Sequence, residues 1–139
     1  MVYAGLAAGV VFLFGGFGLP EVLVRVFPET AGPFIRGLNF GLQGLVALVA
    51  TRFATGFVTA WLYAAARFRL RSTRRTAFRV GCAVWLLLYG PMAGFTIALD
   101  LMPRTVLGFV LAWGLVETGL AALVGGYVHQ ATRPADARY

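Results

Sequence analysis

The sequence is poor in charge and in reactive side chains. Charged residues make up 12% of its 139 residues, whereas a soluble domain carries about 25%, so an ordinary water-soluble fold is excluded. Cys82 is the single cysteine, which excludes an internal disulfide and a site of paired thiols. His129 is the single histidine, and no phosphate-binding loop, nucleophile triad or metal-ligand cluster accompanies it. No catalytic residue, metal site or cofactor-binding residue is therefore predicted, and the sequence does not identify a cofactor.

Apolar residues dominate the chain. They form 60% of it, and its mean hydropathy is +0.81. A transmembrane helix needs about 20 apolar residues to cross the hydrocarbon core, and four such runs use most of the chain. We predict an all-α polytopic membrane protein with one domain and four transmembrane helices in two antiparallel hairpins. Their approximate ranges are 2–19, 43–66, 80–99 and 105–128.

The basic residues are all arginine, and their distribution predicts the topology. Six of the twelve lie between the second and third predicted spans, without an acidic residue among them: Arg67, Arg69, Arg71, Arg74, Arg75 and Arg79. Short basic loops are retained in the cytoplasm, so we expect this loop and both termini to be cytoplasmic. The same arginines are expected to meet anionic lipid headgroups. The net charge of +7 does not predict nucleic-acid binding, because no recognisable binding module accompanies it.

Proline and glycine predict where the helices end or bend. Pro20 followed by Glu21 is typical of a first helical turn, so residues 20–27 are expected to form a short helix along the outer interface. Residues 29–36 are expected to form a turn, and Pro91 should kink the third span near Tyr89. The first span lacks a basic leading segment and a cleavage site, which favours a retained helix over a signal peptide.

Glycines recur at close spacing in several spans. Small residues four apart let membrane helices approach closely, and there are more of them than one compact bundle needs. This excess favours packing against other subunits or a second copy. The glycines expected to pack against helices are Gly5, Gly9, Gly90, Gly94, Gly119, Gly125 and Gly126.

Arg52 and Glu117 lie within predicted spans. A charge near the bilayer centre costs about 2.5–3.5 kcal/mol on insertion scales and needs a partner or a wet cavity. Arg52 lies fifteen residues before Arg67, and Glu117 lies twelve before His129. At about 1.5 Å per residue, these offsets correspond to depths of about 22 and 18 Å. We therefore predict an ion pair between Arg52 and Glu117.

Three interpretations of this pair remain open. It could pin two helices together, or one of its residues could contact another subunit. It could instead lie in a polar cleft where Glu117 takes up a proton or a cation. The cleft would receive hydrogen bonds from Gln43, Thr51, Thr55 and Thr118. His129 is expected to be solvated at the inner surface, and Cys82 to be a small packing residue.

The layout resembles a family of small, uncharacterised four-helix bacterial membrane proteins. The similarity rests on a glycine-rich first span, the segment GFVTAWLYAAAR, a basic turn, and a last span in which Glu117 precedes Gly125 and Gly126. It implies architecture and no catalytic activity. The absence of lysine is typical of a GC-rich bacterial genome, so we expect a multi-pass protein of the bacterial cytoplasmic (inner) membrane.

Two functions are compatible with these features. The first is a non-catalytic accessory or structural subunit that packs its glycine faces against a larger respiratory or photosynthetic membrane complex. The alternative is a small oligomeric transporter or channel that uses Arg52 and Glu117. Membrane lipids and other membrane subunits are the expected partners in either case.

Overall fold

The chain is all-helical over the residues that the computed structural model describes, which are 1–37, 41–67 and 73–132. No strand occurs in these ranges. Four helices are long and apolar enough to cross a membrane, so the predictions of an all-α chain and of four candidate membrane spans are confirmed. The helices are α1 (Val2–Val26), α2 (Pro28–Gly37), α3 (Leu42–Arg67), α4 (Thr73–Ala98) and α5 (Arg104–Ala131).

Two predictions about the segment after the first span are wrong. Pro20 does not begin a helix, because α1 continues through it to Val26. Transmembrane helices tolerate proline because neighbouring groups satisfy the freed backbone carbonyl. Residues 29–36 are helical rather than a turn, since α2 begins at Pro28 with Glu29 in its first turn. The proline and acid signature of a helix start occurs twice, and the second occurrence marks the new helix.

The third long helix begins earlier than predicted. α4 starts at Thr73, so Arg74, Arg75 and Arg79 lie on its first turns and not in a loop. Arg67 ends α3, whereas Arg69 and Arg71 fall outside the described residues. α4 also continues through Pro91 to Ala98. The helix therefore extends beyond the apolar run that predicts its membrane-spanning part.

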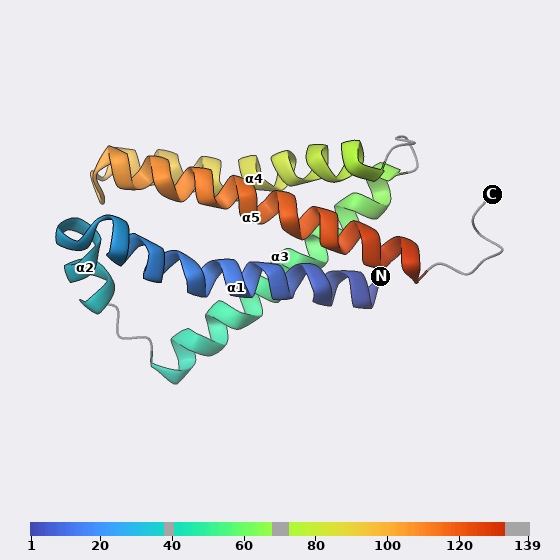
Figure 1. Cartoon of the computed structure of the whole chain (residues 1–139), viewed down its shortest axis with the longest axis horizontal. Coiled ribbons are helices and arrows are strands. Elements are labelled where there is room, and N and C mark those ends of the chain that lie inside the picture. Colours follow the sequence, from blue (N-terminus) through green and yellow to red (C-terminus); the bar gives the residue numbers. More distant parts are fainter. Residues whose placement is uncertain (38–40, 68–72, 133–139) are drawn as a thin grey trace.

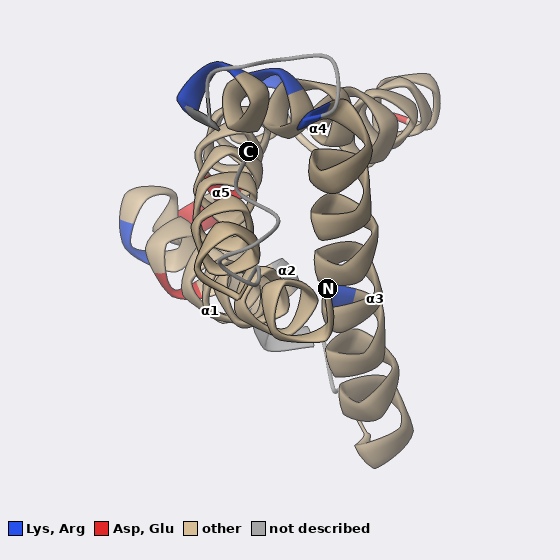
Figure 2. Ribbon diagram, turned by 90° about the vertical axis from the view of Figure 1, so that its right-hand side faces the viewer, with Lys and Arg blue, Asp and Glu red and all other residues tan. Residues whose placement is uncertain are grey.

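The helices run alternately along the long axis of the molecule. Figure 1 places the N-terminus, the start of α4 and the end of α5 near one end, and α2 and the α4 to α5 turn near the other. α2 packs on α1, and its buried Ala31 joins a cluster with Leu23, Tyr89, Val106 and Val110. Figure 2 shows arginine positions clustered at the first turns of α4.

α5 is the central helix, and small residues let its neighbours approach it. It packs against α1, α3 and α4. A Cβ on Gly125 would lie 3.3 Å from the Ala8 side chain of α1, and one on Gly126 would lie 2.7 Å from the Tyr63 ring of α3. A Cβ on Gly81 would lie 3.0 Å from the Gly119 Cα, so α4 also touches α5 at the backbone.

α1 and α3 cross at glycine and then separate. A Cβ on Gly56 would lie 2.5 Å from the Gly9 Cα and 2.7 Å from the Gly5 carbonyl oxygen, which is backbone contact of the small-xxx-small kind. Before this crossing the first turns of α3 lose contact with the bundle: Leu42 is 78% exposed and Val46 is 59% exposed. Figures 1 and 2 show this end of α3 diverging from the other helices. Residues of this end of α3 and of α4 line a common cavity.

Candidate functional site

Three polar side chains from three helices meet in the middle of the bundle. The Arg52 Nη1 of α3 lies 3.2 Å from the Glu117 Oε1 of α5. The Tyr89 hydroxyl of α4 donates a hydrogen bond of 2.7 Å to Glu117 Oε2. Both carboxylate oxygens therefore have a partner, as a buried acid requires. We call Arg52, Tyr89 and Glu117 the polar triad.

Each member of the polar triad lies over a glycine of a neighbouring helix. A Cβ on Gly15 of α1 would overlap the Glu117 carboxylate, and one on Gly16 would lie 2.8 Å from the Arg52 Nε. A Cβ on Gly114 of α5 would overlap the Tyr89 ring. The missing side chains make the room that the triad occupies. These glycines are therefore as much a part of the site as the polar residues.

The burial of the triad is asymmetric. Glu117 has only 3% of its side chain exposed, whereas Arg52 keeps 25% exposed. Trp113 on the neighbouring turn of α5 donates a hydrogen bond of 3.2 Å to the Gly15 carbonyl, which ties α1 to α5 beside the acid. The carboxylate is thus enclosed between helices, while the guanidinium has one side open.

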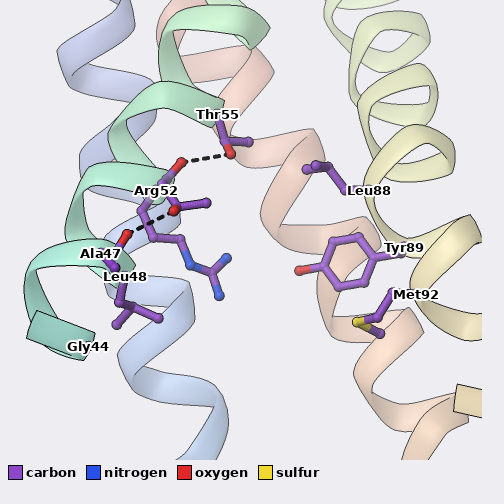
Figure 3. A pocket seen from close by; sticks show the side chains of 9 residues that line it. Gly44, Ala47, Leu48, Arg52, Thr55, Leu88, Tyr89 and Met92 are labelled. Atoms are coloured by element: carbon purple, nitrogen blue, oxygen red, sulfur yellow. Dashed lines mark hydrogen bonds between the residues drawn. The ribbon is translucent and has the colours of Figure 1, made fainter. Parts of the chain in front are cut away.

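The open side of Arg52 faces two cavities that share part of their lining. A cavity of about 390 Å³ lies between α3 and α4, and one of about 580 Å³ lies among all five helices toward α2. Leu48, Arg52 and Met92 line both. Figure 3 shows the guanidinium pointing from α3 into the space before Tyr89 and Met92. The larger cavity is otherwise mostly apolar, with Thr30 as its other polar side chain.

Comparisons with known proteins found no similar sequence or structure: neither a protein-family model, nor a curated protein, nor a solved structure matches the chain. The chemistry of the site is therefore derived from its own residues.

The polar residues around the ion pair differ from those predicted for the cleft. Thr51 and Thr55 line the smaller cavity, but their hydroxyls donate to Ala47 and Thr51 carbonyls of their own helix at 2.8 and 2.9 Å. Thr118 is buried and donates to the Gly114 carbonyl at 2.9 Å. Gln43 is exposed and lines neither cavity. The side chain that joins the ion pair is Tyr89, which the sequence does not single out for this role.

His129 and Cys82 lie away from the triad. His129 is only 7% exposed, so the prediction of a solvated histidine is wrong; its ring packs edge-on against Tyr63, with ring centroids 6.4 Å apart. Cys82 is half-buried. Among the described residues no group of three or more histidine, cysteine or acidic side chains could hold a metal ion.

The predicted glycine faces divide into two groups. Gly5, Gly9, Gly125 and Gly126 contact other helices of the same chain, so they are not available to a partner. A Cβ on Gly90, Gly94 or Gly119 would meet nothing within 4 Å, but the Gly119 backbone itself lies against Gly81 of α4. Gly90 and Gly94 are also exposed. The excess of free glycine faces expected from the sequence is therefore reduced to one stretch of α4.

Proposed function

We propose that this multi-pass membrane protein binds an amphipathic solute at the polar triad and, as an oligomer, carries it across the membrane. The observation that supports the proposal most is that Arg52 keeps 25% of its side chain exposed and lines both cavities. A polar headgroup would meet the guanidinium, and an apolar body would lie along Leu48, Met92 and Val106.

The energetics argue against a purely structural pin. Replacing a buried ion pair with packed apolar side chains is often neutral or stabilising, so holding two helices together does not require charge. A pin would also be best sealed from its surroundings on both sides. In this pair only Glu117 is buried, whereas Arg52 is partly exposed, as expected if Arg52 contacts a ligand.

The proposal is tested by what co-purifies with the protein. Wild type and an Arg52→Met/Glu117→Gln double variant would be extracted mildly from the native membrane, and bound organic compounds identified by mass spectrometry. We expect one amphiphile close to one per site in wild type and absent from the variant. Identical lipid profiles from two equally folded proteins would refute the proposal. Arg25→Met/Glu21→Gln, which neutralises an exposed ion pair on α1, is the matched control.

We also propose that residues 67–79 and both termini lie in the cytoplasm, in a bacterial inner membrane. The support is the arginine cluster, because arginines flanking spans stay on the cytoplasmic side. The N-terminus and the end of α5 lie near the same end of the molecule as the start of α4. The larger cavity, which reaches α2 and the turn at Leu101–Pro103, would then belong to the outer half of the membrane.

A role as accessory subunit is the second candidate, and one surface favours it. Gly90 and Gly94 lie one turn apart on the exposed side of α4 and leave room for a closely approaching helix. Substituting leucine at both should release a large partner complex on native gel electrophoresis. Substituting Gly108, which also has open space around it, should not. An unchanged complex would contradict this role.

A further inference from the structure

The side chains that line the two cavities indicate which class of solute could bind there. Arg52 is the one charged hydrogen-bond donor among the described residues that line the two cavities. Arginine has five N–H donors; one donates to Glu117 at 3.2 Å and the guanidinium also interacts with the Tyr89 hydroxyl, so donors remain for a ligand. The hydroxyl protons of Thr51, Thr55 and Tyr89 are already donated elsewhere. A ligand must therefore bring an acceptor group to Arg52.

The cost of keeping a charge at this depth favours a charged acceptor. A neutral carbonyl could be bound by a neutral donor such as an amide. Such a donor would avoid the cost of about 2.5–3.5 kcal/mol for placing a charge near the bilayer centre. An arginine fork matches the planar oxygens of a carboxylate and forms charge-assisted hydrogen bonds with it. The aliphatic and methionine lining suits an alkyl body. No acidic side chain lines either cavity.

The site stays electrically neutral on binding a carboxylate only if it also takes up one proton. The Arg52 and Glu117 pair is neutral as found, so an added carboxylate would leave one uncompensated negative charge among apolar side chains. Uptake of one proton from solvent by Glu117 removes it. Among the described residues, the titratable groups that contact the Glu117 carboxylate are Arg52 of α3 and Tyr89 of α4, while α1 places Gly15 against it.

We propose that the site binds an alkyl monocarboxylate together with one proton. This inference rests on the proposed function and names its substrate class. In the empty site Glu117 balances the charge of Arg52. In the loaded site the ligand carboxylate takes over that role, and the proton resides on Glu117, whose Oε2 remains beside the Tyr89 hydroxyl. Arg52 exchanges one carboxylate partner for another, so no unpaired charge remains in the bilayer.

The test is calorimetric titration of the full chain in lipid nanodiscs with decanoate, and with methyl decanoate as the uncharged analogue; empty nanodiscs give the background. We expect decanoate to bind with uptake of about one proton, read from buffers of different ionisation enthalpy. Its affinity should fall about tenfold per pH unit, the linkage slope for one proton. Methyl decanoate should bind at least about tenfold more weakly, because the charge-assisted bond is lost.

Two variants make the inference falsifiable. Glu117→Gln mimics the protonated acid, so it should bind decanoate without proton uptake and without the pH slope. Arg52→Met/Glu117→Gln should not bind it, and Glu21→Gln should behave as wild type. Equal binding of ester and acid, or binding without proton uptake in wild type, overturns the inference but leaves the proposed function. If neither ligand binds and no amphiphile co-purifies, both are overturned; if another amphiphile co-purifies, only the inference falls.

Discussion

At the scale of single residues, the central feature is a buried carboxylate, 3% exposed, paired with an arginine that keeps 25% of its side chain exposed. Glu117 bonds to Arg52 and Tyr89, and glycines at positions 15 and 16 give both charged groups their space. Desolvation offsets much of the Coulombic attraction within a buried ion pair. The stability of the pair therefore depends on its hydrogen-bond geometry as well as on the attraction between the charges. Its members should therefore behave as a coupled unit.

This coupling predicts a non-additive effect on stability. Arg52→Met alone leaves Glu117 without its charged partner and should lower the free energy of unfolding by about 3–5 kcal/mol. Adding Glu117→Leu removes the stranded acid, so the double variant should recover most of that loss. Unfolding of the purified proteins in bicelles measures both. A double variant as unstable as the sum of the single variants would show that the two residues are not coupled.

The pairing of Arg52 with Glu117 could be predicted from the sequence, but the residues around the pair could not. Arg52 and Glu117 were predictable as partners because each charge lies within an apolar run and the helical rise brings them to similar depths. Tyr89 was not, because a neutral tyrosine in the middle of a span does not require a charged partner, and only the rotation of α4 turns its hydroxyl toward Glu117. Gly16 indicates close packing from sequence, but not that a guanidinium fills the space.

At the scale of helices, the α1 and α3 crossing positions the site. Gly56 touches the α1 backbone at Gly9, and this contact fixes where α3 begins to diverge and expose Arg52. Helix boundaries were less predictable than helix existence. Hydropathy predicts a start at Val80, but α4 begins at Thr73, because hydropathy does not register that arginine and alanine are good helix formers.

Gly56→Ala should therefore destabilise the fold. The new methyl group would overlap backbone atoms that cannot move aside as a side chain end can, so we expect a loss of about 1–3 kcal/mol. Gly90→Ala is the matched control, because its surroundings are open and alanine favours a helix by up to about 1 kcal/mol over glycine. Reversible unfolding in bicelles measures the difference. A neutral Gly56→Ala would show that the crossing is looser than described.

At the scale of the whole molecule, the alternating helices and the arginine cluster together predict the orientation in the membrane. In a Cys82→Ser background, a cysteine replacing exposed Leu101 should react with a membrane-impermeant maleimide in intact cells. A cysteine replacing Thr132 should react only after the membrane is opened. The reverse pattern would invert the topology and place the larger cavity in the inner half of the membrane.

The central claim is that Arg52 meets a ligand within the membrane, and photo-crosslinking at Met92 tests it most directly. Met92 lines both cavities beside Arg52, so a diazirine analogue of methionine placed there should capture the ligand in native membranes. We predict an adduct with the mass of one alkyl carboxylate, absent from Arg52→Met/Glu117→Gln. The same photoreactive group replacing the exposed Phe95 should capture bulk phospholipid only. Bulk phospholipid at both positions, unchanged in the variant, would contradict the account.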